Sequence, residues 1–498
     1  MLDAALTRDP DHEAVVGSDR RLSYRDLDRA VDRAAAALVE LGVGRHDVVA
    51  VSLPNTTEIV VVFHAVMRVG AIFLGLNRNL APPEKAFILD DAGARILLTD
   101  PASAEPLAPV VAIPVVTSCA DEPGPWLQVS GDAAGAYRRP ICDIDEPAGL
   151  AYTSGTTGRP KGVVHSHRNL LLPGAAVVAA RRYGPDLRKG DCTALTILNL
   201  QVTSTLLVAQ AGGTQIVMDR VDPVGIASWI RQERITSWFG VPTMLHGLAS
   251  SPDVQVHDLA SLCDVWTGGT HLPPTVRRAF EERFGLRVHA TYGMTEVPTI
   301  VTIEPLAEPP VPGSSGRVLP HLVVEIRNDA GDTLPPGQAG EVAVRGRLDG
   351  DWGGLYTPML GYHRQPEATA DTVRDGVLYT GDIGELDTHG NLIIRDRRHA
   401  LILRGGANVY PAEVERVLSD IAGIVGVAVI GLPDERLGQR VAAAVELAPD
   451  AAVSLDVLDA HCRANLARYK VPEEWRLAAL PRNAMGKVIQ AGVRQLFA

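Results

Sequence analysis

The chain has 498 residues and a formal net charge of −12, with 46% hydrophobic and 21% charged residues. This length exceeds one compact core and predicts at least two or three domains, and the composition indicates neither disorder nor a fibrous repeat. The acidic balance argues against nucleic acid or an anionic membrane as a partner and favours small-molecule chemistry.

Cysteine usage and the N-terminus bear on the cellular compartment. The five cysteines lie far apart without a CxxC pair, so neither a zinc site nor a disulfide framework is predicted, and a cytoplasmic monomer or homodimer is expected. The N-terminal MLDAALTRDPDHEAVV lacks a basic region followed by an apolar core, which argues against a signal peptide. In the most apolar window, IVVVFHAVMRVGAIFLGL, His64 and Arg68 favour a buried helix over a membrane span.

The first part of the chain alternates predicted helices and strands. Ser23 and Asp26 form a capping pattern before apolar residues at helical spacing, and Gly42 supplies a stop. DVVAVSLPN then reads as a buried strand, the window from Ile59 as a helix, and ARILLTD as another strand. This alternation predicts an α/β fold with a mainly parallel, helix-covered sheet.

The alternation continues through GTQIVMD, a helix near Ile226 to Glu233 and ITSWFG, and changes after about Pro312. From LVVEIRNDAGDTL to EVAVRG the strands are short and separated by Gly-rich turns, which predicts a small β subdomain at about 313–397. Beyond it, YPAEVERVLSD predicts a helix, and GIVGVAVIGL and RVAAAVEL predict strands. The expected domains are therefore 1–397, with α/β subdomains to about 312, and an α+β domain at 398–498.

One short stretch, YTSGTTGRPKG at 152–162, has the chemistry of a phosphate-binding loop. Its glycines let the backbone approach an anion closely, and its hydroxyl side chains add hydrogen-bond donors. It differs from the P-loop pattern because Lys161 is neither preceded by glycine nor followed by a hydroxyl residue. Taken alone, such a stretch is more often a polar turn after a strand.

The whole string resembles the signature loop of the adenylate-forming superfamily, which includes acyl-CoA synthetases and peptide-synthetase adenylation domains. Four later stretches resemble core motifs of this superfamily in the same order: TYGMTE, YTGDIGELD, RDRRHALILRGGANVYPAEVE and PRNAMGKV. The resemblance spans almost the whole chain. It implies a large AMP-binding domain of two helix-covered sheets and a β-barrel-like subdomain, followed by a small mobile C-terminal lid.

The resemblance also implies a reaction. A carboxylate attacks the α-phosphorus of ATP and gives an acyl-adenylate and pyrophosphate, and a thiol then attacks the acyl carbon. Because both the nucleophile and the phosphates are anionic, the site must control charge. Lys487 matches the lysine of the final motif, whose ammonium would offset this repulsion, and no general base is needed for an acid that is already ionised.

The resemblance assigns further roles residue by residue. Thr295 would contact the α-phosphate, Glu296 would hold Mg²⁺, Asp382 would bind the ribose hydroxyls, and Arg397 would lie near the ribose and phosphate. The other residues expected to bind ATP or AMP are Thr153, Ser154, Gly155, Thr156, Thr157, Gly158, Lys161, Gly268, Gly269, Thr270, Tyr292, Gly293 and Met294. His399 stands at the position of the hinge about which the C-terminal domain rotates between half-reactions.

The loop GGANVYP resembles the form typical of acyl-CoA synthetases, so coenzyme A is the favoured thiol. Gly405, Gly406 and Ala407 would line the path of the pantetheine arm, and Lys470 would suit a phosphate of CoA, although a surface lysine is an equal alternative. A free-standing enzyme that loads an acid onto a carrier protein is the second hypothesis. An inactive nucleotide-binding regulator is the third.

The acid is not predicted. Family members usually carry an aromatic residue and a histidine in the region that matches TALTILNLQVTSTLLVAQAGG, whereas this chain has Asn199, Gln201 and Thr203. A smaller or more polar acyl pocket is one interpretation, and a locally rebuilt helix is another. Position alone suggests further pocket neighbours, which are Trp238, Phe239 and Gly240, with Gly268 and Thr270 beside them. Whether the acid is fatty or aromatic depends on local shape, because one methylene changes binding by only ~1–3 kcal/mol.

Overall fold

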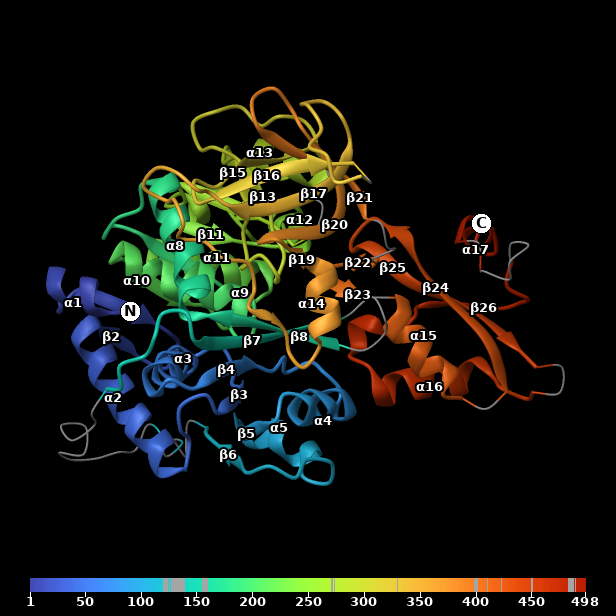
Figure 1. Cartoon of the computed structure of the whole chain (residues 1–498), viewed down its shortest axis with the longest axis horizontal. Coiled ribbons are helices and arrows are strands. Elements are labelled where there is room, and N and C mark those ends of the chain that lie inside the picture. The colour runs from blue at the N-terminus through green and yellow to red at the C-terminus, as the bar shows by residue number, and fades with distance from the viewer. Residues whose placement is uncertain are drawn as a thin grey trace. The chain divides into compact units, whose positions relative to one another are not determined.

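The computed structural model of the chain describes residues 1–119, 124, 126, 139–154, 160–269, 272, 274–328, 330–397, 402–409, 411–421, 423–448, 451–481, 488 and 490–498. The chain forms two compact units (Figure 1). Unit 1 comprises Met1–Arg78, Leu89–Ala151 and Gly162–Asp396, and unit 2 comprises Asn79–Ile88, Tyr152–Lys161 and Arg397–Ala498.

The larger sheet of the described residues has fourteen strands and changes from parallel to antiparallel along its width. Its order is β16 (Leu322–Arg327), β17 (Gly340–Gly346), β20 (Val377–Leu386), β21 (Asn391–Arg397), β15 (Ser314–Val318), β14 (Thr302–Ile303), β13 (Val288–Tyr292), β12 (Asp264–Thr267), β11 (Ser237–Phe239), β9 (Arg188–Asp191), β10 (Thr214–Val217), β1 (Glu13–Val16) and β2 (Arg21–Ser23), with β19 (Val373–Arg374) beside β20. The pairings from β13 through β10 to β1 are parallel. The short strands expected after about 312 exist, and they continue the path of this sheet.

The second sheet of the described part of the chain has seven strands. Its order is β18 (Gly361–Tyr362), β8 (Pro160–Ser166), β7 (Pro147–Ser154), β4 (Ile72–Gly75), β3 (Val48–Ser52), β5 (Ala94–Thr99) and β6 (Val115–Thr117). The strands from β7 to β6 are parallel, as the alternation of strands and helices predicts.

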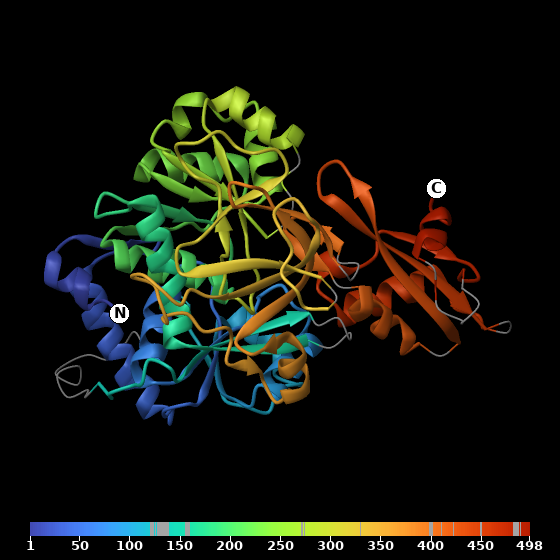
Figure 2. The same cartoon turned by 45° about the horizontal axis from the view of Figure 1, so that its top comes forward.

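Helices cover the sheets of unit 1 (Figures 1 and 2). The principal ones are α2 (Tyr24–Glu40), α3 (Thr57–Val69), α8 (His167–Arg181), α10 (Leu207–Ala211), α11 (Pro223–Glu233), α12 (Pro242–Ser250) and α13 (Pro274–Phe284). Shorter ones are α1 (Asp3–Arg8), α5 (Pro101–Ala104), α9 (Leu198–Leu200) and α14 (Pro366–Thr372), whereas α4 (Pro82–Asp91) begins in unit 2 and ends in unit 1. The sequence did not indicate α14, whose Pro366 stands at a first-turn position that favours helix initiation.

Two helix predictions are confirmed in detail. Ser23 caps α2, because its hydroxyl accepts a hydrogen bond from the backbone N–H of Asp26 at 3.1 Å. In α3, His64 is buried, and Arg68 pairs with Asp28 and Asp32 of α2 at 2.6 and 2.8 Å. The α/β fold class is confirmed. Among the described residues, no helix is both long and apolar enough to cross a membrane.

Unit 2 has an antiparallel sheet with one parallel edge strand. Its order is β23 (Ala407–Val409), β22 (Ile402–Arg404), β25 (Gly438–Leu447) and β24 (Ile424–Asp434), with β26 (Glu474–Leu477) beside β25. The helices are α15 (Pro411–Ser419), α16 (Leu455–Asn465) and α17 (Gln490–Gln495). Pro411 begins α15 as the sequence predicts, and Val414, Val417 and Leu418 pack into the core of this unit.

The parallel strands of the larger sheet have one apolar and one polar face. Side chains alternate between faces along a strand, and paired residues of parallel strands share a face. Trp238 lies in an apolar cluster with Ile216 and Val265 and with residues of α11, α12 and α13. Asp191 of β9 pairs with Phe239, which follows Trp238 and therefore lies on the other face of the sheet. Lys189, two residues before Asp191, lies on that same face. A buried polar face is unusual for parallel strands, which are normally apolar on both sides.

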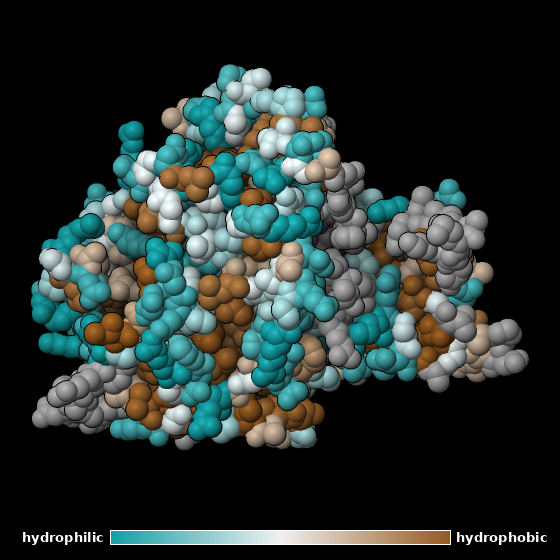
Figure 3. Space-filling model, viewed as in Figure 1, coloured by the Kyte–Doolittle hydropathy of each residue, from teal (hydrophilic) through white to brown (hydrophobic). Residues whose placement is uncertain are grey.

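The face of the protein in Figure 3 mixes hydrophilic and hydrophobic residues. More than half of the surface of a folded protein is normally contributed by apolar atoms, so scattered apolar residues need no special explanation. The mixture by itself marks no docking site.

Candidate active site

The candidate active site of unit 1 lies at the carboxyl ends of three neighbouring parallel strands. Gly240 follows β11, Gly268 and Gly269 follow β12, and Gly293 follows β13. Because ligands bind outside the carboxyl ends of strands in open α/β sheets, the topology brings these predicted residues to the edge where a ligand is expected.

Two of these glycines are required by close packing. A Cβ atom on Gly268 would lie 2.2 Å from Thr291 Oγ1, and one on Gly293 would lie 1.8 Å from the carbonyl oxygen of Thr299. The second contact is with backbone, which cannot move aside as a flexible side chain can. The segment from Tyr292 to Thr299 therefore forms a tight turn that only glycine at position 293 permits.

We expect Gly293→Ala to lower the free energy of unfolding by about 1–3 kcal/mol, because the new methyl group forces the turn open. Urea unfolding measures this change. Gly184→Ala is the matched control, since a Cβ atom there meets nothing within 4 Å, and its effect should stay within about 0.5 kcal/mol. Equal stability of the two variants would show that the turn is more adaptable than its packing indicates.

The turn after β13 brings two predicted nucleotide-binding residues together. The hydroxyl of Tyr292 donates a hydrogen bond to Asp382 Oδ2 at 2.7 Å. Asp382 lies on β20 and is 2% exposed, and the Thr380 hydroxyl accepts a hydrogen bond from its backbone N–H at 3.1 Å. A phenol and a carboxylate from strands about 90 residues apart therefore meet beside the glycines that follow β12 and β13, where they can bind a planar base and a diol.

Thr295 and Glu296 are held by two residues that the sequence did not single out. His165 Nε2 lies 2.7 Å from the Thr295 carbonyl oxygen, and burial lowers the pKa of His165 to about 4. The imidazole is thus neutral at pH 7, and its Nε2–H donates to the carbonyl. The hydroxyl of Tyr362 donates to Glu296 Oε1 at 2.9 Å.

Glu296 fits a magnesium ion bound together with nucleotide phosphates. Its carboxylate is a hard oxygen ligand, and the residue is 8% exposed. Over the described residues, no group of three or more His, Cys, Asp or Glu side chains could hold a metal ion by itself. Since Mg²⁺ is normally bound through one or two carboxylates plus substrate phosphates, a single glutamate is compatible with the predicted magnesium role, which stays a prediction.

Part of the predicted phosphate loop is described. Thr153 and the backbone of Ser154 end β7, and Lys161 lies in β8, so the loop joins two adjacent strands. The backbone of Arg397 ends β21. Seven predicted residues lie outside the described residues: Gly155, Thr156, Thr157, Gly158, Thr270, His399 and Lys487.

In unit 2, Gly405 and Gly406 form the turn between β22 and β23, where Arg404 pairs with Ala407. Both glycines have positive φ, 55° and 83°, which a two-residue hairpin turn of this kind requires. The two glycines are half-buried and leave the backbone of the turn without side chains. The assignment of these residues to CoA stays a prediction.

Lys470 is not a surface lysine. It is 5% exposed, and its Nζ lies 2.7 Å from Glu413 Oε1 and 2.8 Å from Glu84 Oε1, all within unit 2. Burial alone would lower the pKa of Lys470, but Tyr469 and the two carboxylates raise it above its ordinary value. The ammonium is therefore already neutralised, and its assignment to a CoA phosphate stays a prediction that requires these ion pairs to open.

The predicted acyl-pocket residues differ in their surroundings. Gln201 is fully buried, and Thr203 Oγ1 donates to the Asn199 carbonyl oxygen at 3.0 Å. Trp238 is also fully buried, on the face of the sheet that packs against α11 and α12, whereas Phe239 points to the opposite face. Their assignment to the acyl pocket stays a prediction.

His165 and Tyr362 could not have been found from local patterns. A histidine in VVHSH and a tyrosine in MLGYH have no spacing that relates them to Thr295 or Glu296. Their roles depend on the pairing of β8 with β18, which places Tyr362 opposite Val163.

Comparison with known proteins identifies the family of the chain. The model of the AMP-binding enzyme family matches residues 2–352, and that of the AMP-binding enzyme C-terminal domain matches residues 413–487. The chain is similar to the long-chain-fatty-acid–CoA ligase FadD13 of Mycobacterium tuberculosis, with 33% identity over 100% of this chain and 98% of that protein. It is also similar to the feruloyl-CoA synthase of an Amycolatopsis species, with 34% identity over 98% of this chain and 96% of that protein.

Among solved structures, the amide bond synthetase McbA from Marinactinospora thermotolerans has a TM-score of 0.88 and 30% identity, covering 100% of this chain and 99% of that chain. The family models match well over half of the chain, and both relatives match over nearly their full length. The chain therefore belongs to the AMP-binding enzymes of the adenylate-forming superfamily.

Proposed function

We propose that the protein is an AMP-forming acid–CoA ligase, which activates a monocarboxylic acid with ATP and transfers the acyl group to coenzyme A. The observation that carries the proposal is the meeting of Tyr292 with Asp382 directly beside Thr295 and Glu296 at the carboxyl ends of the parallel strands. The relatives that span this chain, FadD13 and the feruloyl-CoA synthase, are named as CoA ligases.

The described residues can perform the binding steps of this reaction. Asp382 accepts hydrogen bonds from the ribose hydroxyls, and Tyr292, held by Asp382, packs against the base. Thr295 offers a hydroxyl to the α-phosphate, and the neutral His165 fixes its backbone. Because these groups are mostly uncharged and preorganised, they orient the nucleotide without having to rearrange during attack.

Glu296 would hold Mg²⁺, which neutralises phosphate charge when it is bound. Tyr362 orients the carboxylate for this purpose through its hydrogen bond to Oε1. The acid needs no general base, since its carboxylate is ionised near neutral pH. Acyl transfer then requires a thiol, and the turn of Gly405 and Gly406 is the place where we expect the pantetheine arm to pass.

Product analysis tests the proposal directly. The protein is incubated with ATP, Mg²⁺ and CoA and with each of octanoate, palmitate, benzoate, ferulate and indole-3-acetate, and nucleotides and thioesters are separated by chromatography. We expect AMP, pyrophosphate and one acyl-CoA in equal amounts for the accepted acid, because the α-phosphorus is the point of attack. Formation of ADP would overturn the proposal.

The acceptor is tested in parallel. A phosphopantetheinyl carrier protein and a primary amine each replace CoA in the same assay. AMP release that requires the carrier protein would favour the carrier-loading hypothesis. Amide formation without thioester would favour the activity named for McbA. If the protein catalyses no acid-dependent exchange of pyrophosphate into ATP, the hypothesis of a nucleotide-binding regulator is favoured.

A further inference from the structure

The helical segment that follows β9 changes its hydrogen-bonding pattern at η2 (Gln201–Leu206). The N–H of Leu207 donates to the carbonyl of Val202, five residues earlier, which is the pattern of a π-helix. Such turns have less favourable geometry than α-helices and often occur at functional sites. The sequence QVTSTL is rich in β-branched and hydroxyl residues, which are poor helix formers, so contacts outside the segment must hold it.

Those contacts form a buried polar network around Thr205. The Thr205 hydroxyl donates to Gln201 Oε1 at 2.7 Å and accepts from Gln215 Nε2 at 3.0 Å. Gln215 Nε2 also donates to Ser204 Oγ at 3.0 Å, and Gln201 Nε2 donates to the Leu195 carbonyl at 2.7 Å. All four side chains of the network belong to residues that are at most 2% exposed. One hydroxyl thus connects η2 to β10 and to the segment before α9.

A buried ion pair on β9 lies beside the network, because Gln215 of β10 pairs with Lys189 of β9. Asp191 Oδ1 lies 3.0 Å from Lys189 Nζ, and burial raises the pKa of Asp191, while Ser204 is close enough to lower it. The Lys189 ammonium also lies 4.5 Å from the ring centroid of Trp266 on β12. η2 is therefore hydrogen-bonded to β10 through Gln215, and the ion pair of β9 is buried on the same face of the sheet.

The same segment borders the carboxyl ends of the strands. Phe239, the last residue of β11, packs against the cluster that contains Leu198 and Leu200, and its ring lies edge-on to Trp266 with 5.9 Å between centroids. On the opposite side, a Cβ atom on Gly149 of β7 would come within 2.8 Å of Leu198. Since β7 leads into the hydroxyl-rich loop, the segment with α9 and η2 lies between the two sheets at the edge where ligands bind.

We propose that Thr205 and Gln215 are positioning residues for the acid. They hold the π-turn through Gln201, and the shape of this turn sets which acids the enzyme accepts, although neither residue contacts the acid. This inference rests on the proposed function, because it assumes that an acid occupies the edge beside η2. Gln201 is likewise a positioning residue, because its amide nitrogen donates one hydrogen bond and its amide oxygen accepts another.

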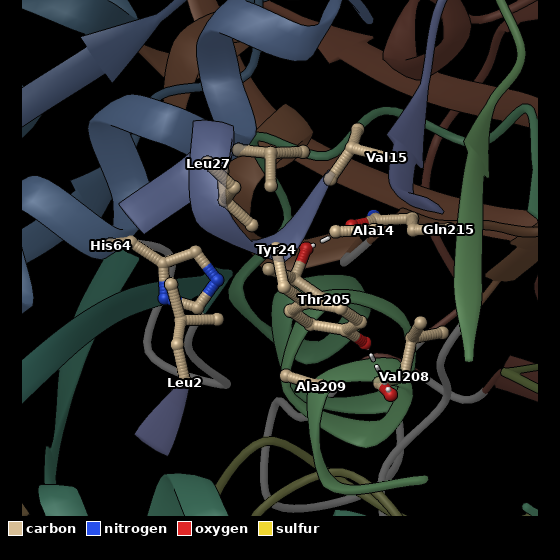
Figure 4. Close-up of a pocket in the computed structure, with 11 residues that line it drawn as sticks. Leu2, Ala14, Val15, Tyr24, Leu27, His64, Thr205, Val208, Ala209 and Gln215 are labelled. Carbon is tan, nitrogen blue, oxygen red and sulfur yellow. Dashed lines mark hydrogen bonds between the residues drawn. The ribbon is translucent and has the colours of Figure 1, made fainter. Parts of the chain in front are cut away.

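A small cavity lies on the far side of the network (Figure 4). Thr205 and Gln215 line it together with Tyr24, Leu27 and His64, and burial lowers the pKa of His64 to about 3, so that no charged histidine faces it at pH 7. The cavity borders the Gln215 and Thr205 side chains, so the packing on this side of the network is incomplete. Loss of the hydroxyl should therefore release η2 without unfolding the sheet.

The test compares Thr205→Val, which keeps the shape and removes the hydroxyl, with Thr205→Ser, which keeps the hydroxyl. For the best acid of the panel of octanoate, palmitate, benzoate, ferulate and indole-3-acetate, we expect Thr205→Val to raise KM about tenfold, equivalent to about 1.4 kcal/mol. The KM for ATP should stay within about twofold, and the rank order of the acids should change. Thr205→Ser should restore the acid KM to within about twofold of the wild type.

Hydrogen exchange of the backbone amides gives a second readout that needs no activity. Amides of Gln201–Leu206 should exchange faster in Thr205→Val than in Thr205→Ser, while those of β9 and β10 stay protected. An unchanged acid profile in Thr205→Val, or an equal rise of the KM values for acid and ATP, would overturn the inference. A wild type that produces no AMP with any acid would instead contradict the proposed function, and unchanged exchange in Thr205→Val would still overturn the hydrogen-bond role.

Discussion

Replacing Lys487 by alanine is expected to slow formation of the acyl-adenylate by about 100- to 1,000-fold, the usual effect of removing one group that stabilises transition-state charge. The carboxylate of the acid and the phosphates of ATP repel each other, and Lys487 is the residue that we propose to offset this repulsion. Acid-dependent exchange of pyrophosphate into ATP measures this half-reaction alone.

The same variant should still convert a supplied acyl-adenylate into acyl-CoA, because the second half-reaction involves no attack on phosphorus. Arg463→Ala is the matched control, since it also removes a cation of unit 2, from the exposed face of α16. The control should retain both half-reactions. Equal loss of both half-reactions in Lys487→Ala would mean that the lysine has another role or that the variant is misfolded.

Local patterns predicted the elements that carry their own signals. Ser23 and Asp26 identify the start of α2, and Pro411 identifies the start of α15, because capping and the fixed φ of proline depend only on neighbouring residues. The signature strings likewise pointed to Tyr292 and Asp382, and the fold brings these two residues into contact.

The polar face of the larger sheet could not be predicted in this way. The strand β9 reads RKGD, a sequence typical of a surface turn, yet Lys189 and Asp191 are at most 1% exposed. Each charge is tolerated in the interior only because the other lies within 3.0 Å, and local sequence cannot show that pairing. Lys470 is a second example, because its carboxylate partners are distant in the chain.

The π-turn is another feature that local sequence patterns could not predict. The absence of the usual aromatic residue and histidine indicated either a polar pocket wall or a rebuilt helix, and the structure has a π-turn at Gln201–Leu206. A side-chain network links this turn to Gln215 on β10, and no helical periodicity within the segment could reveal that link.

The buried ion pair gives the largest expected change in stability. Lys189→Met removes the ammonium and leaves the Asp191 carboxylate without its counter-charge, and breaking a buried pair in this way costs about 3–5 kcal/mol of unfolding free energy. Arg220→Met is the matched control, because the Arg220–Asp222 pair is about half exposed, and its loss should cost no more than about 1 kcal/mol. Chemical denaturation of the two variants measures both changes.

The destabilisation of Lys189→Met should also depend on pH. Burial raises the pKa of Asp191, and Lys189 lowers it, so removal of the lysine raises the folded-state pKa further above the unfolded value of about 3.9. Between these two values the folded state binds the proton more tightly than the unfolded state, and stability falls as pH rises. Lys189→Met should therefore lose more stability at pH 8 than at pH 5, and Lys189→Met/Asp191→Asn, which lacks the unpaired charge, should be the more stable variant at pH 8. If the loss in Lys189→Met were equal at both pH values, an unpaired Asp191 carboxylate could not be its cause.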